Sequence, residues 1–342
     1  MNPFTYRTAT DASTAVATVA HRPGAMFLGG GTNLVDHLKL GLATPELLVD
    51  VSKLPFDSIT PTADGGVSVG AEVRNSDLAS HPLIRERYPM LSLALLSGAS
   101  AQLRNLATTA GNILQRTRCV YFQDLDTPCN KRRPGSGCAA AQGSSRYHAI
   151  LGASPRCIAT HPSDMAVALA ALDAVVVISG TDGERRIGIG DIYGDPAQDP
   201  ARDTVLNHGD LITGVELPAA EVAGNSTYHK VRDRASYAFA LVSVAAALAV
   251  EDGTITDVRV ALGGVAHKPW RAHRAEHVLR GSAATDDVFR RAAEAELAAA
   301  APYRGNAYKI PLVTGALTLV LRRLARTAPT HGEETRTKGG AS

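Results

Sequence analysis

The sequence predicts an α+β protein of two domains, and three observations lead to this fold class. The chain has 342 residues, about the length of two average domains. Short apolar runs of strand length alternate with amphipathic helical stretches over the first hundred residues. A strongly apolar stretch, 238–250, follows a turn-rich segment, and we place the domain boundary near residue 220.

The first domain, residues 1–220, is expected to open with a short helix whose N-cap is Asp11. The elements expected next, in chain order, are strand 25–28, a helical turn at 34–39, strands 46–51 and 66–71, a helical region at 77–98, helix 163–172, and strands 174–178 and 211–218. The second domain, 221–326, is expected to contain strand 258–262 and helices at about 286–300 and 312–326. The polar, glycine-rich end, 327–342, is expected to be disordered.

The charge balance excludes several classes of partner. Lys and Arg total 35 against 33 Asp and Glu, a net charge of +2, so the chain carries no strong field to attract nucleic acid. No apolar run approaches the ~20 residues of a membrane span. The first residues lack the charged and apolar regions of a secretory signal. We therefore expect neither a nucleic-acid partner nor membrane insertion.

A glycine-rich loop, Gly29-Gly30-Gly31-Thr32-Asn33, directly follows the strand expected at 25–28. Successive glycines let backbone N–H groups form a concave anion site and let a pyrophosphate approach without Cβ clashes. The spacing matches neither the dinucleotide fingerprint GxGxxG nor the phosphate loop GxxxxGK[ST]. The loop is therefore either an unconventional phosphate cradle or a tight structural turn.

Two further segments carry small and polar residues. Thr108-Thr109-Ala110-Gly111-Asn112-Ile113 supplies hydroxyls and an amide, which suit a dinucleotide whose phosphates are held by neutral donors. His161-Pro162-Ser163-Asp164 precedes the helix expected at 163–172, where Ser163 fits an N-cap. Asp164 is then free to hydrogen-bond a ribose or a ring edge. The alternative is a structural turn for 108–113 and a plain N-cap for 161–164.

All four cysteines fall within 39 residues, in a segment, 116–157, that shows no hydrophobic period. Such long irregular segments are usually functional. The spacing is Cys119-x9-Cys129-x8-Cys138-x18-Cys157, without the short CxxC knuckles of a structural zinc site. Spacing alone leaves an iron–sulfur cluster, zinc and no metal open. The basic residues that would offset the charge of a thiolate cluster are Arg116, Arg118, Lys131, Arg132 and Arg133.

Taken in order, these segments resemble one known family. The matching runs are LGGGTNL at 28–34, RNLATTAGNI at 104–113, HPSD at 161–164, YHK at 228–230 and LGGVAHKP at 262–269. Together they resemble the FAD-binding medium subunit of the molybdenum hydroxylases, the xanthine dehydrogenase and aldehyde oxidoreductase family, over nearly the whole chain to about residue 326. The resemblance implies a two-subdomain FAD-binding domain of the PCMH type, followed by a smaller α+β domain.

The resemblance also implies which residues bind FAD. Those placed at the pyrophosphate are Leu28, Gly29, Gly30, Gly31, Thr32, Asn33 and Leu34. Those placed at the second half of the dinucleotide are Thr108, Thr109, Gly111 and Asn112. It further implies Leu114 and Ile212 near the isoalloxazine, Asp164 at polar groups of FAD, and Lys230 near the flavin or the acceptor entrance.

The cysteine-rich insertion resembles a subgroup of this family that carries an additional [4Fe-4S] cluster. Two branches have it, the periplasmic-type aldehyde oxidoreductases and the 4-hydroxybenzoyl-CoA reductases, and the segment RTRCVYF at 116–122 is closer to the aldehyde branch. The resemblance implies Cys119, Cys129, Cys138 and Cys157 as the cluster ligands.

The family implies that this chain holds no catalytic residue for substrate oxidation. A large subunit with a molybdenum cofactor would oxidise an aldehyde or a xanthine-type substrate, and a small [2Fe-2S] subunit would deliver electrons to the FAD and on to an external acceptor. The alternatives are the β subunit of a 4-hydroxybenzoyl-CoA-reductase-like enzyme and a stand-alone flavin oxidoreductase. We expect assembly in the cytoplasm, and a final location there or in the periplasm through co-export with a signal-bearing partner.

Overall fold

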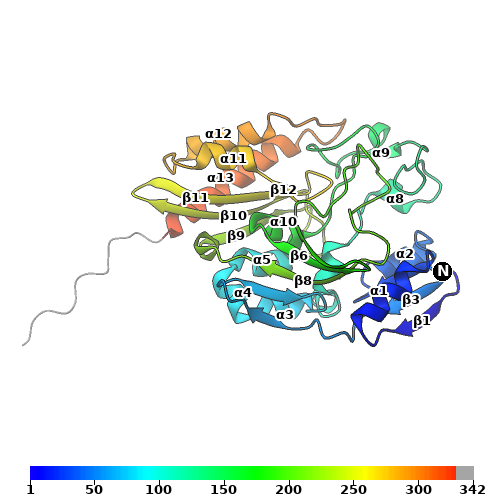
Figure 1. Cartoon of the computed structure of the whole chain (residues 1–342). Coiled ribbons are helices and arrows are strands. Elements are labelled where there is room, and N and C mark those ends of the chain that lie inside the picture. The colour runs from blue at the N-terminus through cyan, green and yellow to red at the C-terminus, as the bar shows by residue number, and fades with distance from the viewer. Residues whose placement is uncertain (329–342) are drawn as a thin grey trace, which may run out of the picture.

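The computed structural model describes residues 1–328, in which three β-sheets are separated and covered by helices (Figure 1). The first sheet has three parallel strands, the second five antiparallel strands and the third four antiparallel strands. This confirms the α+β class. Residues 327–342 were predicted to be disordered, and of these 329–342 lie outside the described residues. Within 1–328, no helix combines the length and apolarity that crossing a membrane requires.

The N-terminal unit is a small parallel sheet with helices between its strands. Its elements are β1 (Thr5–Thr8), α1 (Ala12–Ala20), β2 (Ala25–Leu28), α2 (Leu34–Leu40) and β3 (Leu47–Asp50), with strand order β1-β3-β2. Asp11 caps α1 as predicted, because its Oδ1 accepts a hydrogen bond of 2.8 Å from the N–H of Thr14. Strand β1 was not predicted, since all four of its residues are exposed and show no apolar alternation.

The second sheet forms the middle of the molecule. In spatial order its strands are β4 (Ile59–Pro61), β5 (Val67–Gly70), β8 (Leu211–Leu217), β6 (Val175–Gly180) and β7 (Gly183–Gly188). Helix α10 (Asp164–Ala171) packs between this sheet and the C-terminal one, and all eight of its residues are buried. A helix that is apolar on every side belongs in such a position, because each face meets protein.

The helical region predicted at 77–98 is three separate helices rather than one. They are α3 (Asn75–Ser80), α4 (Pro82–Arg87) and α5 (Pro89–Ser97). Pro82 and Pro89 each occupy the first turn of a helix, where a missing N–H costs nothing. A proline also disfavours helical geometry in the residue before it, and His81 is accordingly extended, with ψ of 130°.

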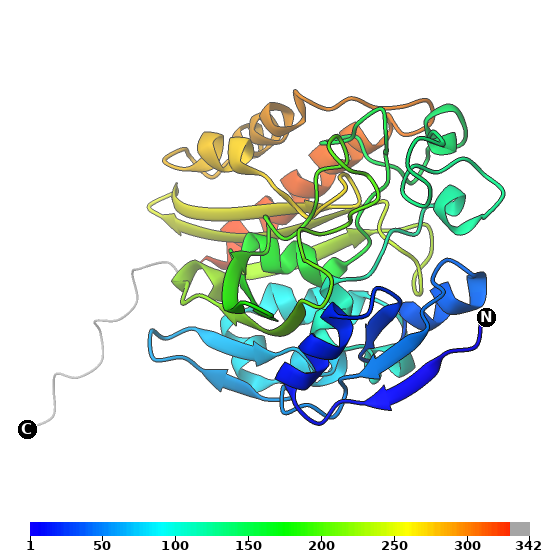
Figure 2. The ribbon, with the colours of Figure 1, turned by 45° about the vertical axis from the view of Figure 1, so that its right-hand side comes forward.

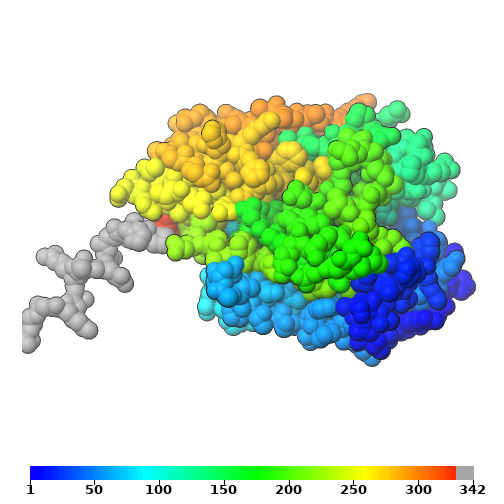
Figure 3. Space-filling view, viewed as in Figure 1, coloured from blue at the N-terminus to red at the C-terminus, as the bar shows by residue number. Residues whose placement is uncertain are grey.

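The cysteine-rich insertion is irregular, as its composition predicts. Its only regular elements among the described residues are two single turns, α8 (Val120–Gln123) and α9 (Ala139–Gln142). The short helices α6 (Ala101–Arg104) and α7 (Thr109–Ile113) lead into it. Figures 2 and 3 show the insertion, in teal and green, at one end of the molecule above the blue N-terminal unit.

The C-terminal sheet is covered on one face by three helices and on the other by α5 and α10 (Figure 1). Its strands, in spatial order, are β12 (Trp270–Arg271), β11 (Thr254–Gly263), β10 (Val242–Glu251) and β9 (Ser226–Val231). The covering helices are α11 (His273–Leu279), α12 (Asp286–Leu297) and α13 (Lys309–Thr327). The boundary predicted near 220 falls between β8 and a 3-10 turn, Glu221–Gly224.

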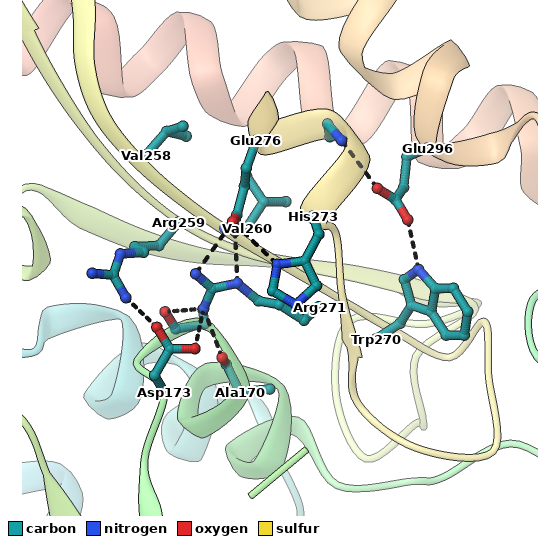
Figure 4. Close-up of polar contacts among 12 residues, drawn as sticks. Ala170, Asp173, Val258, Arg259, Val260, Trp270, Arg271, His273, Glu276 and Glu296 are labelled. Carbon is teal, nitrogen blue, oxygen red and sulfur yellow. Dashed lines mark hydrogen bonds and ion pairs between the residues drawn. The ribbon is translucent and has the colours of Figure 1, made fainter. Parts of the chain in front are cut away.

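Arg271 of β12 ties the C-terminal end of α10 to the last sheet (Figure 4). Its Nη1 donates hydrogen bonds of 2.9 and 2.7 Å to the carbonyls of Ala170 and Ala171, and one of 2.9 Å to Asp173. Its Nε donates to Glu276 of α11 at 2.6 Å. A cation at this end of a helix also interacts favourably with the helix dipole. Arg271 thereby fixes the C-terminal end of α10 against the last sheet; Asp164 lies at the other end of this helix.

Candidate functional site

The two glycine-containing loops that were predicted separately lie directly against each other. A Cβ at Gly30 would overlap the carbonyl oxygen of Leu106, and Gly31 has a φ of +72°, in the left-handed region. Glycine is therefore required at both positions by a close approach and by backbone conformation. The loop 29–33 joins β2 to α2: the predicted members Leu28 and Leu34 are the last residue of β2 and the first of α2, and Thr32 lies in the loop between them.

The second loop is organised by its two threonines. Thr108 caps α7, with its Oγ1 accepting from the N–H of Gly111 at 3.2 Å, and Thr109 donates to the carbonyl of Val73 at 3.1 Å. Both threonines are buried. Asn112 then connects this loop to the third predicted segment, because its Oδ1 accepts a hydrogen bond of 2.6 Å from Ser163. Ser163 also caps α10, as predicted, by accepting from the N–H of Ala166 at 2.9 Å.

Asn33 connects the first loop to the start of the insertion. Its Oδ1 accepts a hydrogen bond of 2.9 Å from the backbone N–H of Arg116. All three predicted segments and the insertion therefore meet in one region, although they are separated by up to about 130 residues in the chain.

Asp164 and Lys230, which were both predicted near the flavin, form a buried ion pair. The Lys230 ammonium lies 2.7 Å from Oδ2 of Asp164, and Oδ1 accepts a hydrogen bond of 2.6 Å from the Tyr228 hydroxyl. Lys230 also donates to the carbonyl of Ser97 at 3.2 Å. Burial, followed by the charge of Asp164, holds the pKa of Tyr228 well above its usual range, so this hydroxyl keeps its proton.

A hollow of about 490 Å³ opens beside the C-terminal end of α7. Leu114 lines it, together with His161, Tyr193 and His267. The rings of His161 and Tyr193 meet edge to face with centroids 4.5 Å apart. Burial lowers the pKa of His161 to about 4 and that of His267 to about 4, so both imidazoles are neutral at neutral pH.

Ile212 does not line this hollow. It lies in β8, is only 2% exposed and packs in the hydrophobic core of the middle sheet. The flavin contact that the resemblance implies for Ile212 stays a prediction, as do the individual FAD contacts of the other residues.

The four cysteines line a second hollow, of about 300 Å³. Cys129 and Cys138 face each other across an isolated antiparallel bridge, and Cys157 lies in a tight turn that begins at Ser154. Cys119 Sγ lies 3.2 Å from Nε2 of His148. Burial raises the pKa of Cys119 to about 12 and also raises that of Cys157, so these thiols are protonated unless a metal displaces their protons.

One carboxylate stands between the two hollows. Asp203 forms ion pairs with the ammonium of Lys131, at 2.5 Å, and with the guanidinium of Arg116. Lys131 lines both hollows, as does Cys157. Burial alone would raise the pKa of Asp203, but the charges of Lys131 and Arg116 outweigh it and hold that pKa below its usual value.

Sequence reasoning missed several of these residues. Tyr228 had a usable signal, since it lies two positions before Lys230 in a strand and therefore points to the same face. His267 lies within the family run at 262–269, but no role was assigned to it. Tyr193 and Asp203 had no signal, because each comes from a connecting segment whose partner residues lie far away in the chain.

The two adjoining loops and the three sheets fit the class of protein that the resemblance implies, a flavoprotein. Residues 2–220 match the family described as "FAD binding domain in molybdopterin dehydrogenase". Residues 226–324 match the family described as "CO dehydrogenase flavoprotein C-terminal domain". The chain belongs to the FAD-binding medium subunits of the molybdenum hydroxylases, and it is an oxidoreductase subunit.

Known relatives agree with this assignment. The chain is 51% identical to the aldehyde oxidoreductase FAD-binding subunit PaoB of Escherichia coli over 323 residues, covering 94% of this chain and 98% of that one. It is 28% identical to the glyceraldehyde dehydrogenase medium chain of Sulfolobus acidocaldarius, covering 77% and 76%. Among solved structures, carbon monoxide dehydrogenase from Hydrogenophaga pseudoflava superposes with a TM-score of 0.75 at 25% identity, covering 96% of this chain and 100% of that one.

Proposed function

We propose that this chain is the FAD-binding electron-transfer subunit of a molybdenum-containing aldehyde oxidoreductase. The similarity to the aldehyde oxidoreductase subunit of E. coli, 51% over nearly the full length of both chains, is the observation that carries the aldehyde assignment. When bound, FAD supplies the ability to accept two electrons and pass them to an external acceptor. The residues of this chain bind and orient it.

The predicted contacts suit FAD in their chemistry. Backbone N–H groups of the loop 29–33 are neutral donors, which suit a pyrophosphate without a lysine. Gly30 lets this loop lie against the carbonyl of Leu106, which a Cβ would overlap. The Asp164–Lys230 pair places one negative and one positive group at the start of α10, where a ring edge needs both acceptor and donor.

We further propose that the four cysteines bind a [4Fe-4S] cluster. Support comes from the hollow that all four cysteines line. The four irons of a cluster take thiolates at separate corners, so cysteines that come from different parts of an irregular segment suit it. Lys131 offsets part of the negative charge.

The cluster anchors an insertion that otherwise lacks a hydrophobic core. The partners we propose are a large molybdenum-cofactor subunit that oxidises the aldehyde and a small [2Fe-2S] subunit that delivers electrons to this chain. Assembly in the cytoplasm follows from the need to insert both cofactors, and the complex then stays there or reaches the periplasm with a signal-bearing partner.

The test is to express the chain with its partner subunits, purify it anaerobically and measure the visible spectrum, FAD, iron, zinc and aldehyde oxidation. We expect flavin bands and about four iron atoms for this chain's cluster. Cys138→Ser is expected to lower the iron content and destabilise the insertion, whereas Val120→Ala, exposed beside Cys119, leaves both unchanged. Zinc without iron would overturn the cluster, and reduction of 4-hydroxybenzoyl-CoA in place of aldehyde oxidation would favour the alternative enzyme.

A further inference from the structure

An acidic side chain lies beneath the loop that binds the pyrophosphate. Glu72 follows β5, and its backbone N–H is held by the carbonyl of Phe56 at 2.8 Å. The side chain turns toward the glycine loop: a Cβ built on Gly29 would lie 3.3 Å from Oε1 of Glu72 and 3.1 Å from Oγ1 of Thr108. Glu72 therefore forms part of the floor beneath the glycine loop, and Thr108 of the second predicted FAD loop contacts the same glycine.

The carboxyl of Glu72 has no compensating partner. The residue is 5% exposed, and its Oε2 is shielded from solvent with no hydrogen-bond partner among residues 1–328. A buried carboxylate oxygen without a donor is strongly unfavourable. A protonated carboxyl removes the charge and supplies a donor.

Burial, rather than the neighbouring charges, disfavours ionisation of Glu72. Burial raises the pKa of Glu72 to about 7, the charge of Arg74 opposes this rise, and the smaller effect of Asp50 reinforces it. The guanidinium of Arg74 is directed to the carbonyl of Leu106, to which it donates at 2.6 Å. Asp50, at the end of β3, accepts a hydrogen bond from Tyr6. Among residues 1–328, therefore, no cation forms an ion pair with Glu72.

A negatively charged pyrophosphate brought to the glycine loop adds a further like charge near this carboxyl. Like charges disfavour ionisation of a carboxylate, so the ligand and the protonated acid support each other. By linkage, a ligand that prefers the protonated form takes up a proton when it binds to the ionised form.

We propose that Glu72 is an additional FAD-binding residue that holds a proton on its carboxyl when FAD is bound. In the binding reaction, the chain with ionised Glu72 takes up one proton and one FAD, and in the resulting complex Glu72 is a neutral acid. FAD retention by this chain therefore depends on pH through a residue of the loop floor, which goes beyond the electron-transfer role proposed above and does not require the cluster.

The test measures FAD binding to the flavin-depleted full-length chain between pH 6 and 9, by titration calorimetry in two buffers of different ionisation enthalpy. For the wild-type chain we expect the affinity to fall by up to about tenfold per pH unit above pH 7, with uptake of up to about one proton. Glu72→Gln keeps the shape and a donor but cannot ionise, so its affinity is expected to be flat and its proton uptake to vanish.

A matched control is Glu296→Gln. Glu296 is also a buried carboxyl, but it bonds to Trp270 and to the N–H of Ala275 in the C-terminal domain (Figure 4), so wild-type proton uptake is expected. Proton uptake that persists unchanged in Glu72→Gln would assign it to another group and overturn the proposal. A wild-type chain that binds FAD without proton uptake would overturn it without any variant, whereas failure to bind FAD at all would contradict the family assignment instead.

Discussion

The ammonium nitrogen of Lys131 lies 2.5 Å from a carboxylate oxygen of Asp203, and this contact joins the cysteine insertion to the segment that lines the neighbouring hollow. Lys131 lies between Cys129 and Cys138 in the chain. Asp203 also binds Arg116, whose backbone N–H donates to Asn33 of the glycine loop. A continuous set of contacts thus runs from the glycine loop to the cysteine-lined hollow through one carboxylate.

Replacing Asp203 by asparagine is expected to loosen both sites. The change leaves Lys131, whose side chain is 9% exposed, and Arg116 without their shared counter-charge. Breaking a partly buried pair of this kind should lower the free energy of unfolding by roughly 2 kcal/mol. Urea unfolding together with iron and FAD content checks this. Asp191→Asn, at an exposed carboxylate in the same connecting region, should leave all three quantities unchanged.

Lys230→Met is expected to destabilise the chain more than the Asp203 variant. It leaves Asp164, whose side chain is 9% exposed, as a buried charge that only Tyr228 still contacts. The expected loss is about 3–5 kcal/mol, the cost typical of removing one partner of a buried pair. The double variant Lys230→Met with Asp164→Asn should recover part of this loss in a double-mutant cycle. Additive losses would show that the two residues are not coupled.

Gly30→Ala is expected to weaken FAD binding by at least about tenfold, or about 1.4 kcal/mol, because its Cβ would force the glycine loop away from Leu106. FAD fluorescence titration measures the effect. Gly190→Ala is the matched control, since a Cβ there has no neighbour within 4 Å. Equal affinities for the two variants would mean that the contact between the two loops does not shape the site.

Removal of the Arg271 side chain is expected to loosen the contact between α10 and the C-terminal sheet. Arg271→Ala deletes hydrogen bonds to Ala170, Ala171 and Glu276, and it should cost roughly 3 kcal/mol (Figure 4). Thermal unfolding and limited proteolysis would report the change. The control Arg274→Ala, at a neighbouring exposed residue, should have little effect. Comparable losses of stability in the two variants would show that the Arg271 contacts do not hold α10 in place.

Stability should also depend on pH through Glu72. Its pKa rises from 4.5 to about 7 on folding, so the folded chain holds this proton more tightly than the unfolded chain. The associated stabilisation is fully present below the unfolded pKa and is lost as pH rises through the folded one. We therefore compare the free energy of unfolding of Glu72→Gln with that of the wild type, both without flavin. Between pH 4.5 and pH 8 this difference should shift in favour of the variant by up to about 3 kcal/mol. Denaturant unfolding at both pH values checks the sign.

The sequence by itself determined the local features of this protein. The Asp11 and Ser163 caps, the positions of the glycine loop and the irregular cysteine segment follow from interactions within a few residues, and each was predictable. Helix breaks at Pro82 and Pro89 are equally local, but the prediction of one helical region over 77–98 did not use the two prolines. The family motifs also emerged from their order along the chain.

Only the tertiary structure decided which of these features touch. Asp164 and Lys230 were predicted as separate flavin contacts, and the fold brings the start of α10 and β9 close enough to make them a pair. Glu72 carries no motif, and it becomes notable only because Gly29 lies above it. The physical reason is that capping and periodicity act over a few residues, whereas burial, ion pairing and the resulting pKa shifts depend on residues that the topology brings together from distant parts of the chain.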